Sequence, residues 1–235
     1  MNARRVRDIE YQLLSGSERK TTDIVIERNG EVVVRPPKNC SPEKVDAVVE
    51  SKRMWIYRNL AEWRDLNATA VVREWVNGET FLYLGRSHRL SLMANQDSAL
   101  KLKDGRFCLN RNLIDEGGTD AAKHAFEQYY IVKGLQRIKN RVEYYTPKVG
   151  VRPTSIKVKE MGYRWASCGK NNSLSFHWKC MMAPPKIIDY IIVHELCHIH
   201  KQNHSDAFWN EVDKVMPDYR ERKEWLKLNG ANLDL

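Results

Sequence analysis

The first half of the chain alternates short apolar segments with turn residues, a pattern typical of β-strands. Residues 23–28 and 31–35 flank Asn29-Gly30, a dipeptide that favours a two-residue hairpin. Between this hairpin and the strands that follow, Ser41-Pro42 begins one long helix that extends to about Leu66. Five further strands are predicted, as in an antiparallel meander, at residues 71–76, 81–84, 88–93, 99–102 and 106–109.

The spacing of apolar residues changes to that of helices after Gly117-Gly118. Thr119 is the predicted N-cap of a long helix that extends to about Tyr145. Short strands follow at residues 155–159, 163–167 and 173–179, Pro184-Pro185 begins an apolar helix, and two more helices start near Ser205 and Pro217. We therefore predict an α+β fold with two parts. Residues 1–117 form an antiparallel β-rich region with one long helix, and residues 118–235 form the catalytic domain.

The segment HELCHIHKQNH, residues 194–204, has the spacing of a metal site. His194 and His198 are four residues apart, so both lie on one face of a helix and can bind one ion. Glu195 lies about 100° further round the helix, where it can reach water at the metal without being a ligand. His204 can join only if the helix ends first, and the stretch 201–203 offers that exit because Asn tolerates left-handed backbone.

Catalytic zinc takes three protein ligands and keeps a fourth position for water. The spacing therefore predicts one Zn²⁺ per chain, held by His194, His198 and His204, with Glu195 as general base. A metzincin would have Gly where this chain has Lys201, so that class is not indicated.

Cysteine usage and hydropathy favour a cytoplasmic protein. The five cysteines are odd in number and form no CxxC pair, which indicates neither a disulfide framework nor a structural zinc knuckle. The N-terminus has no apolar signal core, and no segment approaches the roughly 18 apolar residues of a membrane span. We therefore expect no membrane partner.

The net charge of +9 and the isoelectric point near 9.3 leave three functions open. The first is a zinc metallopeptidase acting on a peptide substrate. The second is a metal-dependent phosphohydrolase acting on nucleotides, whose anionic substrate would suit a basic surface. The third is a nucleic-acid-associated protein with structural zinc, which requires a fourth ligand such as Cys168 or Cys180. The basic residues are scattered and no nucleic-acid motif stands out, and the sequence does not indicate an oligomeric state.

Three segments carry a family resemblance. They are GYRWASCGKNNSLSFHWKCMMAP, IDYIIVHELCHIHKQNHSDAFW and MPDYRERKEWLKLNG. Over residues 156–230 the chain resembles the YgjP-like metal-dependent hydrolases, relatives of the SprT-like and minimal-gluzincin zinc peptidases. The resemblance implies a zincin-like core, in which a short sheet lies beside the HExxH helix and the strand at residues 164–168 borders the cleft. Ala166 and His177 depart from the Gly and Asn of many relatives.

Six more residues are candidate contacts to the substrate or the transition state. Arg164 and Ser167 belong to the strand that the resemblance places at the cleft, and His200 is next to the metal ligands in sequence. Tyr219 and Arg220 could stabilise an oxyanion or belong to a surface ion pair, and His177 completes the set. Because an extended peptide can pair with an open strand, the peptidase is the main hypothesis.

Overall fold

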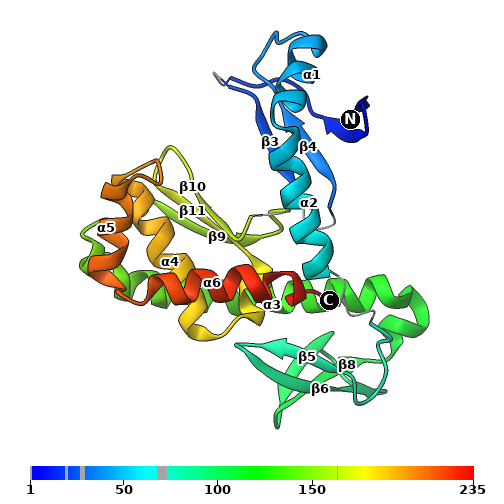
Figure 1. The fold of residues 1–235 in the computed structure, drawn as a ribbon. Helices are drawn as coiled ribbons and strands as arrows, with labels where there is room; N and C mark the ends of the chain where they lie inside the picture. The colour runs from blue at the N-terminus through cyan, green and yellow to red at the C-terminus, as the bar shows by residue number, and fades with distance from the viewer. Residues whose placement is uncertain (1, 19–20, 27–29, 68–72, 163) are drawn as a thin grey trace. The chain divides into compact units, whose positions relative to one another are not determined.

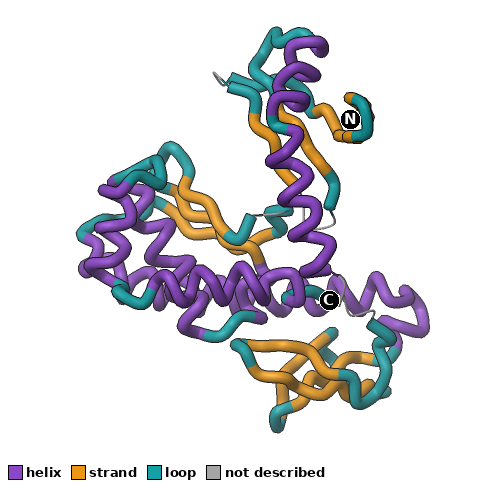
Figure 2. The backbone as a smooth tube through the Cα atoms, viewed as in Figure 1, coloured by secondary structure: helices purple, strands orange, loops and turns teal. Residues whose placement is uncertain are grey.

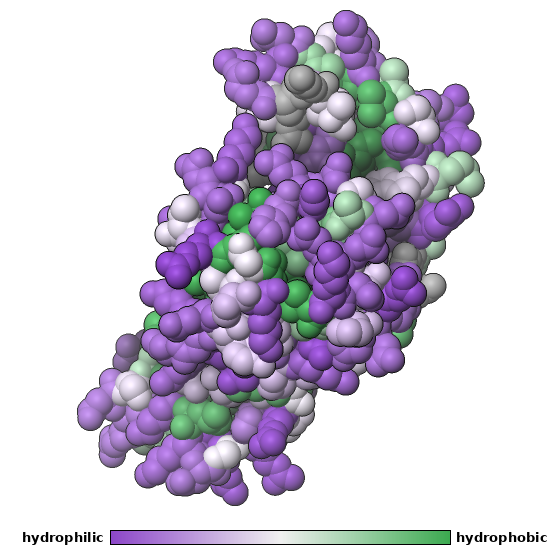
Figure 3. Space-filling model, turned by 90° about the vertical axis from the view of Figure 1, so that its left-hand side faces the viewer, coloured by the Kyte–Doolittle hydropathy of each residue, from purple (hydrophilic) through white to green (hydrophobic). Residues whose placement is uncertain are grey.

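The computed structural model describes residues 2–18, 21–26, 30–67, 73–162 and 164–235, and it divides into two compact units, Met1–Ala70 and Val71–Leu235. The strands form three separate small sheets beside several helices (Figures 1 and 2), so the predicted α+β class is confirmed. Hydrophilic residues cover most of the face drawn in Figure 3. No helix of the described residues combines the length and apolar character that a bilayer span requires.

The first unit is a four-stranded sheet with two helices. The predicted hairpin forms between β3 and β4, although part of its turn lies outside the described residues. A second hairpin, β1–β2, was not predicted, and β2 pairs with β4 in parallel. The single long helix predicted here is interrupted at Lys52, while Ser41 caps its start as expected. The elements are β1 (Asn2–Val6), β2 (Ile9–Leu13), β3 (Asp23–Ile26), β4 (Val32–Arg35), α1 (Pro42–Ser51) and α2 (Arg53–Asn67).

The second unit begins with the sheet β5–β8, in the order β5-β6-β8-β7. The predicted meander is wrong, because β6 and β8 pair in parallel and join two antiparallel hairpins. The strand predicted at residues 71–76 does not form over its described part, 73–76. There the Glu79 carboxylate accepts the backbone N–H of Trp75 at 2.6 Å, and Trp75 has φ 58°. The strands are β5 (Thr80–Tyr83), β6 (Arg86–Met93), β7 (Leu100–Lys103) and β8 (Arg106–Asn110).

Helix α3 (Asn112–Val149) is the long helix of the second unit, and it contacts both β7–β8 and the sheet β9–β11 (Figure 1). Its backbone is interrupted at Gly118, with φ 65°, directly before the predicted N-cap Thr119, and it ends at Gly150, with φ 78°. The division into compact units falls between residues 70 and 71, so β5–β8 belongs to the same unit as the metal-site helix. A separate catalytic domain over residues 118–235 stays a prediction.

The remaining elements surround helix α4, which carries the HExxH motif. The sheet β9–β11 has the order β10-β11-β9, so β10 is an edge strand. Helix α4 packs against α3, α5, α6 and β10, and Ile187, Ile188, Ile191 and Ile192 are buried. The elements are β9 (Ser155–Lys159), β10 (Ala166–Cys168), β11 (Ser173–His177), η1 (Trp178–Met182), α4 (Pro185–His200), α5 (Asp206–Val215), α6 (Tyr219–Asn229) and η2 (Gly230–Asn232).

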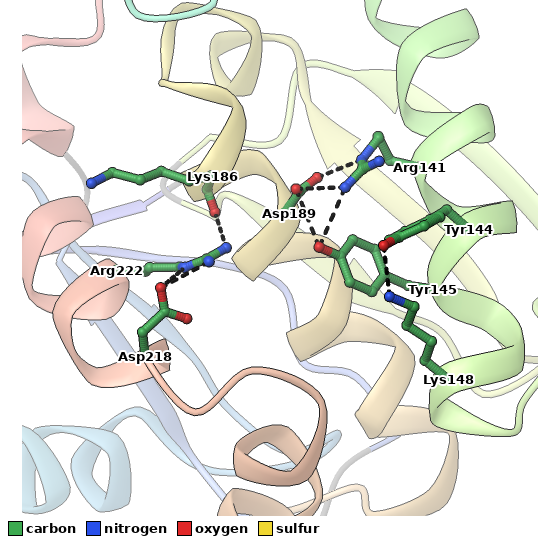
Figure 4. Close-up of polar contacts among 8 residues, drawn as sticks. All are labelled: Arg141, Tyr144, Tyr145, Lys148, Lys186, Asp189, Asp218 and Arg222. Atoms are coloured by element: carbon green, nitrogen blue, oxygen red, sulfur yellow. Dashed lines mark hydrogen bonds and ion pairs between the residues drawn. The ribbon is translucent and has the colours of Figure 1, made fainter.

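Polar contacts fix α4 to its neighbours (Figure 4). Arg141 of α3 donates two hydrogen bonds of 2.7 Å to the two carboxylate oxygens of Asp189, and the Tyr145 hydroxyl donates a third at 3.2 Å. On α6, Arg222 donates to the backbone carbonyl of Lys186 at 2.9 Å. Because a bidentate Arg–carboxylate pair is directional, these contacts set the position of α4 as well as stabilising it.

We expect Asp189→Ala to lower the free energy of unfolding by about 1–2 kcal/mol, because Arg141 and Tyr145 both lose their acceptor while Arg141 remains partly solvated. Urea denaturation measures the change. Asp213→Ala on exposed α5 is the matched control and is expected to stay within about 0.5 kcal/mol of the unsubstituted protein. An equal loss in both variants would show that the network contributes nothing specific.

Candidate metal centre

Three histidine side chains meet at the end of α4. The Nε2 atoms of His194 and His198 are 3.1 Å apart, those of His198 and His204 are 3.1 Å apart, and those of His194 and His204 are 3.0 Å apart. Among the described residues, no fourth His, Cys, Asp or Glu joins this group. The arrangement is therefore an almost equilateral triangle of imidazole nitrogens.

The nitrogen triangle fits a small divalent ion. Ligands at 2.0–2.1 Å from a tetrahedral zinc lie roughly 3.3 Å apart, close to the separations seen here. The Nδ1 atom of His198 lies 3.0 Å from the Lys201 carbonyl oxygen, which can only accept a hydrogen bond. Nδ1 therefore carries the proton, and the Nε2 lone pair points into the group. Lone pairs facing one another repel unless a cation lies between them, so the donor set suits a metal.

Burial keeps the histidines neutral. Together with the neighbouring His198 and His204, it lowers the pKa of His194 from 6.5 to about 3. Burial also lowers the pKa of His198 and that of His204. Neutral imidazole is the form that binds metals, so the three ligands need not release protons near neutral pH.

The chain brings His204 back to α4 by ending the helix early. The helix stops at His200, and Lys201 has extended backbone, with φ −130° and ψ 104°. The exit lies in the predicted stretch, but it does not use the left-handed conformation expected for Asn203. Trp209 of α5 then stacks on the His204 ring, with a centroid distance of 5.6 Å. Stacking on Trp209 of α5 therefore holds His204 against the other two rings.

Glu195 lies beside the triangle and is buried, with 6% of its surface exposed. Burial raises the pKa of its carboxyl group to about 8, while the charge of Arg164 and a hydrogen bond from the Cys168 backbone N–H lower it. A cation held by the histidines would lower this pKa further, because an opposite charge favours the ionised form. The site therefore holds a carboxyl group whose pKa can lie near neutrality, as general base catalysis requires.

A cleft of about 460 Å³ opens over the histidines and Glu195, within the size range of ligand sites. One wall is strand β10. The backbone of Trp165 accepts from His177 N–H at 2.8 Å, and Gly169 N–H donates to Ser173 at 2.8 Å, so both residues face β11. Because antiparallel residues alternate, Ala166 and Cys168 direct their backbone groups to the open edge. Cys168 N–H binds Glu195 there, which agrees with this alternation.

The structure brings some of the candidate contact residues to the cleft and places others elsewhere. Arg164 and Ser167 line it. His177 is 1% exposed, because its ring is in the core and pairs with Glu160 at 2.8 Å. The structure therefore does not bring His177 to the cleft.

The other three candidates do not line the cleft either. His200 bonds to Glu211 at 2.9 Å, because it lies on another face of α4. The Tyr219 ring is buried against Trp209, and Arg220 donates to the Tyr219 hydroxyl at 3.2 Å. The Tyr219–Trp209 contact holds α6 to α5, whereas exposed Arg220 contacts Tyr219 within α6.

Sequence reasoning missed several residues of the cleft and its surroundings. Lys170, Asn172 and Gln202 line the cleft. Lys223 lies with its Nζ 4.3 Å from the centre of the Trp209 ring, behind His204. Its position four residues after Tyr219 places both on one face of α6, and that spacing is the signal that could have identified it. The lining residues in the turn after β10 have no comparable signal.

A comparison with protein families finds a match. A model of the YgjP-like family, described as a metallopeptidase domain, matches residues 20–229. Among solved structures, the chain is similar to the crystal structure of the metallopeptidase zymogen of Pyrococcus abyssi abylysin. The two are 22% identical, the match covers 37% of this chain and 89% of that chain, and the TM-score is 0.35. The comparison with curated proteins finds no match.

Proposed function

The chain belongs to the YgjP-like family of metallopeptidase domains, and we propose that it is a zinc peptidase with a zincin-like core in which Glu195 is the general base. Family membership makes it a metal-dependent hydrolase. The zinc ion, the peptide substrate and the role of Glu195 are the further steps of the proposal. The observation that carries it is the triangle of three Nε2 atoms, 3.0–3.1 Å apart, beside a buried carboxyl group.

The residues of the site have distinct tasks in peptide hydrolysis. His194, His198 and His204 would hold the zinc ion, which when bound supplies positive charge that acidifies water and polarises a carbonyl group. Glu195 accepts the proton of the attacking water and passes it to the amine that leaves. The Cys168 backbone N–H donates a hydrogen bond that fixes the position of this carboxylate. The apolar core around α4 excludes water from behind the site and strengthens these charges.

The open edge of β10 supports a peptide as the substrate. Ala166 directs both backbone groups away from β11 and lines the cleft, so an extended chain can pair with it. Pairing would place one peptide bond across the cleft in front of the histidines. A backbone contact of this kind holds substrates of different sequence in the same orientation, which suits a peptidase.

We expect chelation to abolish hydrolysis of an unstructured peptide and stoichiometric Zn²⁺ to restore it. The metal-free protein keeps Glu195 but loses the charge on which its role depends. Mass-spectrometric detection of products before chelation, after chelation and after Zn²⁺ addition gives the result. Circular dichroism at each step is the control for folding. Undiminished cleavage by protein with no measurable metal would contradict the proposal.

A nucleotide phosphohydrolase is the second candidate, favoured by Arg164 and Lys170 in the cleft lining. The same protein incubated with the common nucleoside triphosphates and assayed for pyrophosphate distinguishes the two reactions. If the protein hydrolyses nucleotides, Glu195→Gln abolishes that activity and no peptide is cleaved, the phosphohydrolase replaces the peptidase proposal.

Structural zinc in a nucleic-acid-associated protein has less support. Such sites are normally closed by four protein ligands. Cys180 is buried and its Sγ donates to the Trp165 carbonyl at 3.3 Å, and neither Cys168 nor Cys180 joins the group of metal-ligating atoms among the described residues. The three-histidine set with an adjacent carboxyl group suits catalysis better.

A further inference from the structure

The cleft has an uneven distribution of charge. Among its lining residues, Arg164 and Lys170 are exposed cations, and Glu195 is the one carboxylate. Arg164 is close enough for its charge to act on Glu195. Because Glu195 is buried while the two cations are exposed, the surface that a substrate meets first is positive.

The two cations lie beyond the two ends of strand β10. Arg164 precedes the strand by two residues, and Lys170 follows it by two. The three residues of the strand span roughly 10 Å. An extended peptide paired with Ala166 would therefore pass Arg164 at one end and Lys170 at the other. A single phosphate group needs cations that converge on one point, so this spread favours an extended ligand.

A third cation lies behind the histidines. Lys223 of α6 is exposed and stands over the Trp209 ring, which stacks on His204. Lys223 does not line the cleft, so it adds to the positive field without contacting a substrate paired with β10.

We propose that the cleft selects extended peptides with acidic side chains on both sides of the scissile bond, recognised by Arg164 and Lys170 within a field strengthened by Lys223. This inference rests on the proposed peptidase function and specifies its substrate class. Exposed ion pairs are each worth about a three- to fivefold change in affinity, so two matched carboxylates predict roughly tenfold discrimination. Because exposed charges are screened, the preference is expected to decrease at high salt.

Binding can be measured without turnover. The protein is the full-length Glu195→Gln variant loaded with zinc. The probes are fluorescent ten-residue peptides with both ends blocked, and they carry acidic, neutral or basic residues on either side of one central bond. Fluorescence anisotropy at low and high salt gives the dissociation constants. We expect the acidic peptide to bind about tenfold more tightly than the neutral one at low salt, and the basic peptide to bind more weakly than both.

Charge reversal identifies the residues responsible. In the same background, the double variant Arg164→Glu with Lys170→Glu is expected to bind the acidic peptide at least tenfold more weakly. It should bind the basic peptide more tightly. Lys223→Glu should weaken binding of the acidic peptide by a smaller factor. The loss should be the same for acidic residues before and after the central bond. Lys103→Glu, at an exposed position of β7, changes the charge as much as Lys223→Glu and half as much as the double variant; it is the control and should leave the binding of all three peptides unchanged. If the double variant does not fold by circular dichroism, Arg164→Gln and Lys170→Gln replace it, with the preference expected to disappear.

The outcomes separate this inference from the peptidase proposal. Equal binding of the three peptides overturns the charge selection even if the wild type cleaves them all. An acidic preference that survives the double reversal also overturns it, since the carboxylates would then be binding the metal. A preference for the acidic peptide that is lost when Arg164 and Lys170 are reversed supports the charge selection. If the wild type then cleaves no peptide, that result counts against the peptidase proposal alone.

Discussion

Replacing Glu195 by Gln is expected to lower the rate of hydrolysis by about 10²–10⁴-fold while leaving the metal content unchanged. Gln keeps the shape of the side chain and can still accept the Cys168 N–H, but its amide cannot take a proton from water. The loss should therefore be in kcat, with KM nearly unchanged. Initial rates on one peptide, with metal content measured in the same samples, give both quantities.

Glu211→Gln is the matched control for this substitution. Glu211 bonds to His200 on the neighbouring helix and does not line the cleft. The same loss of a carboxylate there should leave the rate within about twofold of the unsubstituted protein, because no reacting atom depends on it. If Glu195→Gln retains full activity, Glu195 is not the base, whatever the metal content.

Glu195→Gln also has a consequence for stability in the metal-free protein. Burial raises the pKa of Glu195 to about 8, from an ordinary value of 4.5. The ionised form is therefore less stable in the folded state, and the wild type loses stability as the pH rises from about 4.5 to 8. Gln does not titrate, so the difference in unfolding free energy between the two proteins should move in favour of Glu195→Gln over this range. Parallel urea titrations show it, and a pH-independent difference would contradict the burial of a titrating carboxyl group.

His204→Ala is expected to weaken metal binding by at least about 100-fold, beyond the 10–100-fold effect of losing an outer-sphere partner of a ligand. Its Nε2 lies 3.0 Å from that of His194 and 3.1 Å from that of His198, and removing it leaves two ligands. Two imidazoles from one helical turn cannot enclose an ion. Competition with a chromogenic chelator measures the affinity.

His200→Ala removes a histidine four residues before His204 and serves as the control. Its ring bonds to Glu211 rather than to the triangle, so metal affinity should change little. Equal losses for both variants would mean that the substitutions disturb α4 generally. An unchanged affinity in His204→Ala would exclude this residue as a ligand.

Local sequence signals identified most of the elements of the second unit. The strands β5 to β9, β11 and the helix α4 lie close to the predicted ranges, because turn residues and proline act on the backbone next to them. The pairing of those strands was predicted less well. The parallel pair β6–β8 and the hairpin β1–β2 depend on contacts between distant residues. No proline or glycine at Lys52 predicts the break between α1 and α2.

The sequence by itself determined the metal-site motif, since the spacing of His194 and His198 and the position of Glu195 follow from the repeat of one helix. Tertiary structure alone decided how His204 returns, which candidate residues reach the cleft, and that Lys170 and Lys223 lie near it. The physical reason is distance. A helical repeat fixes side chains within a few residues of one another, whereas the cleft forms between α4, β10 and the loop that follows α4, whose packing depends on the whole unit.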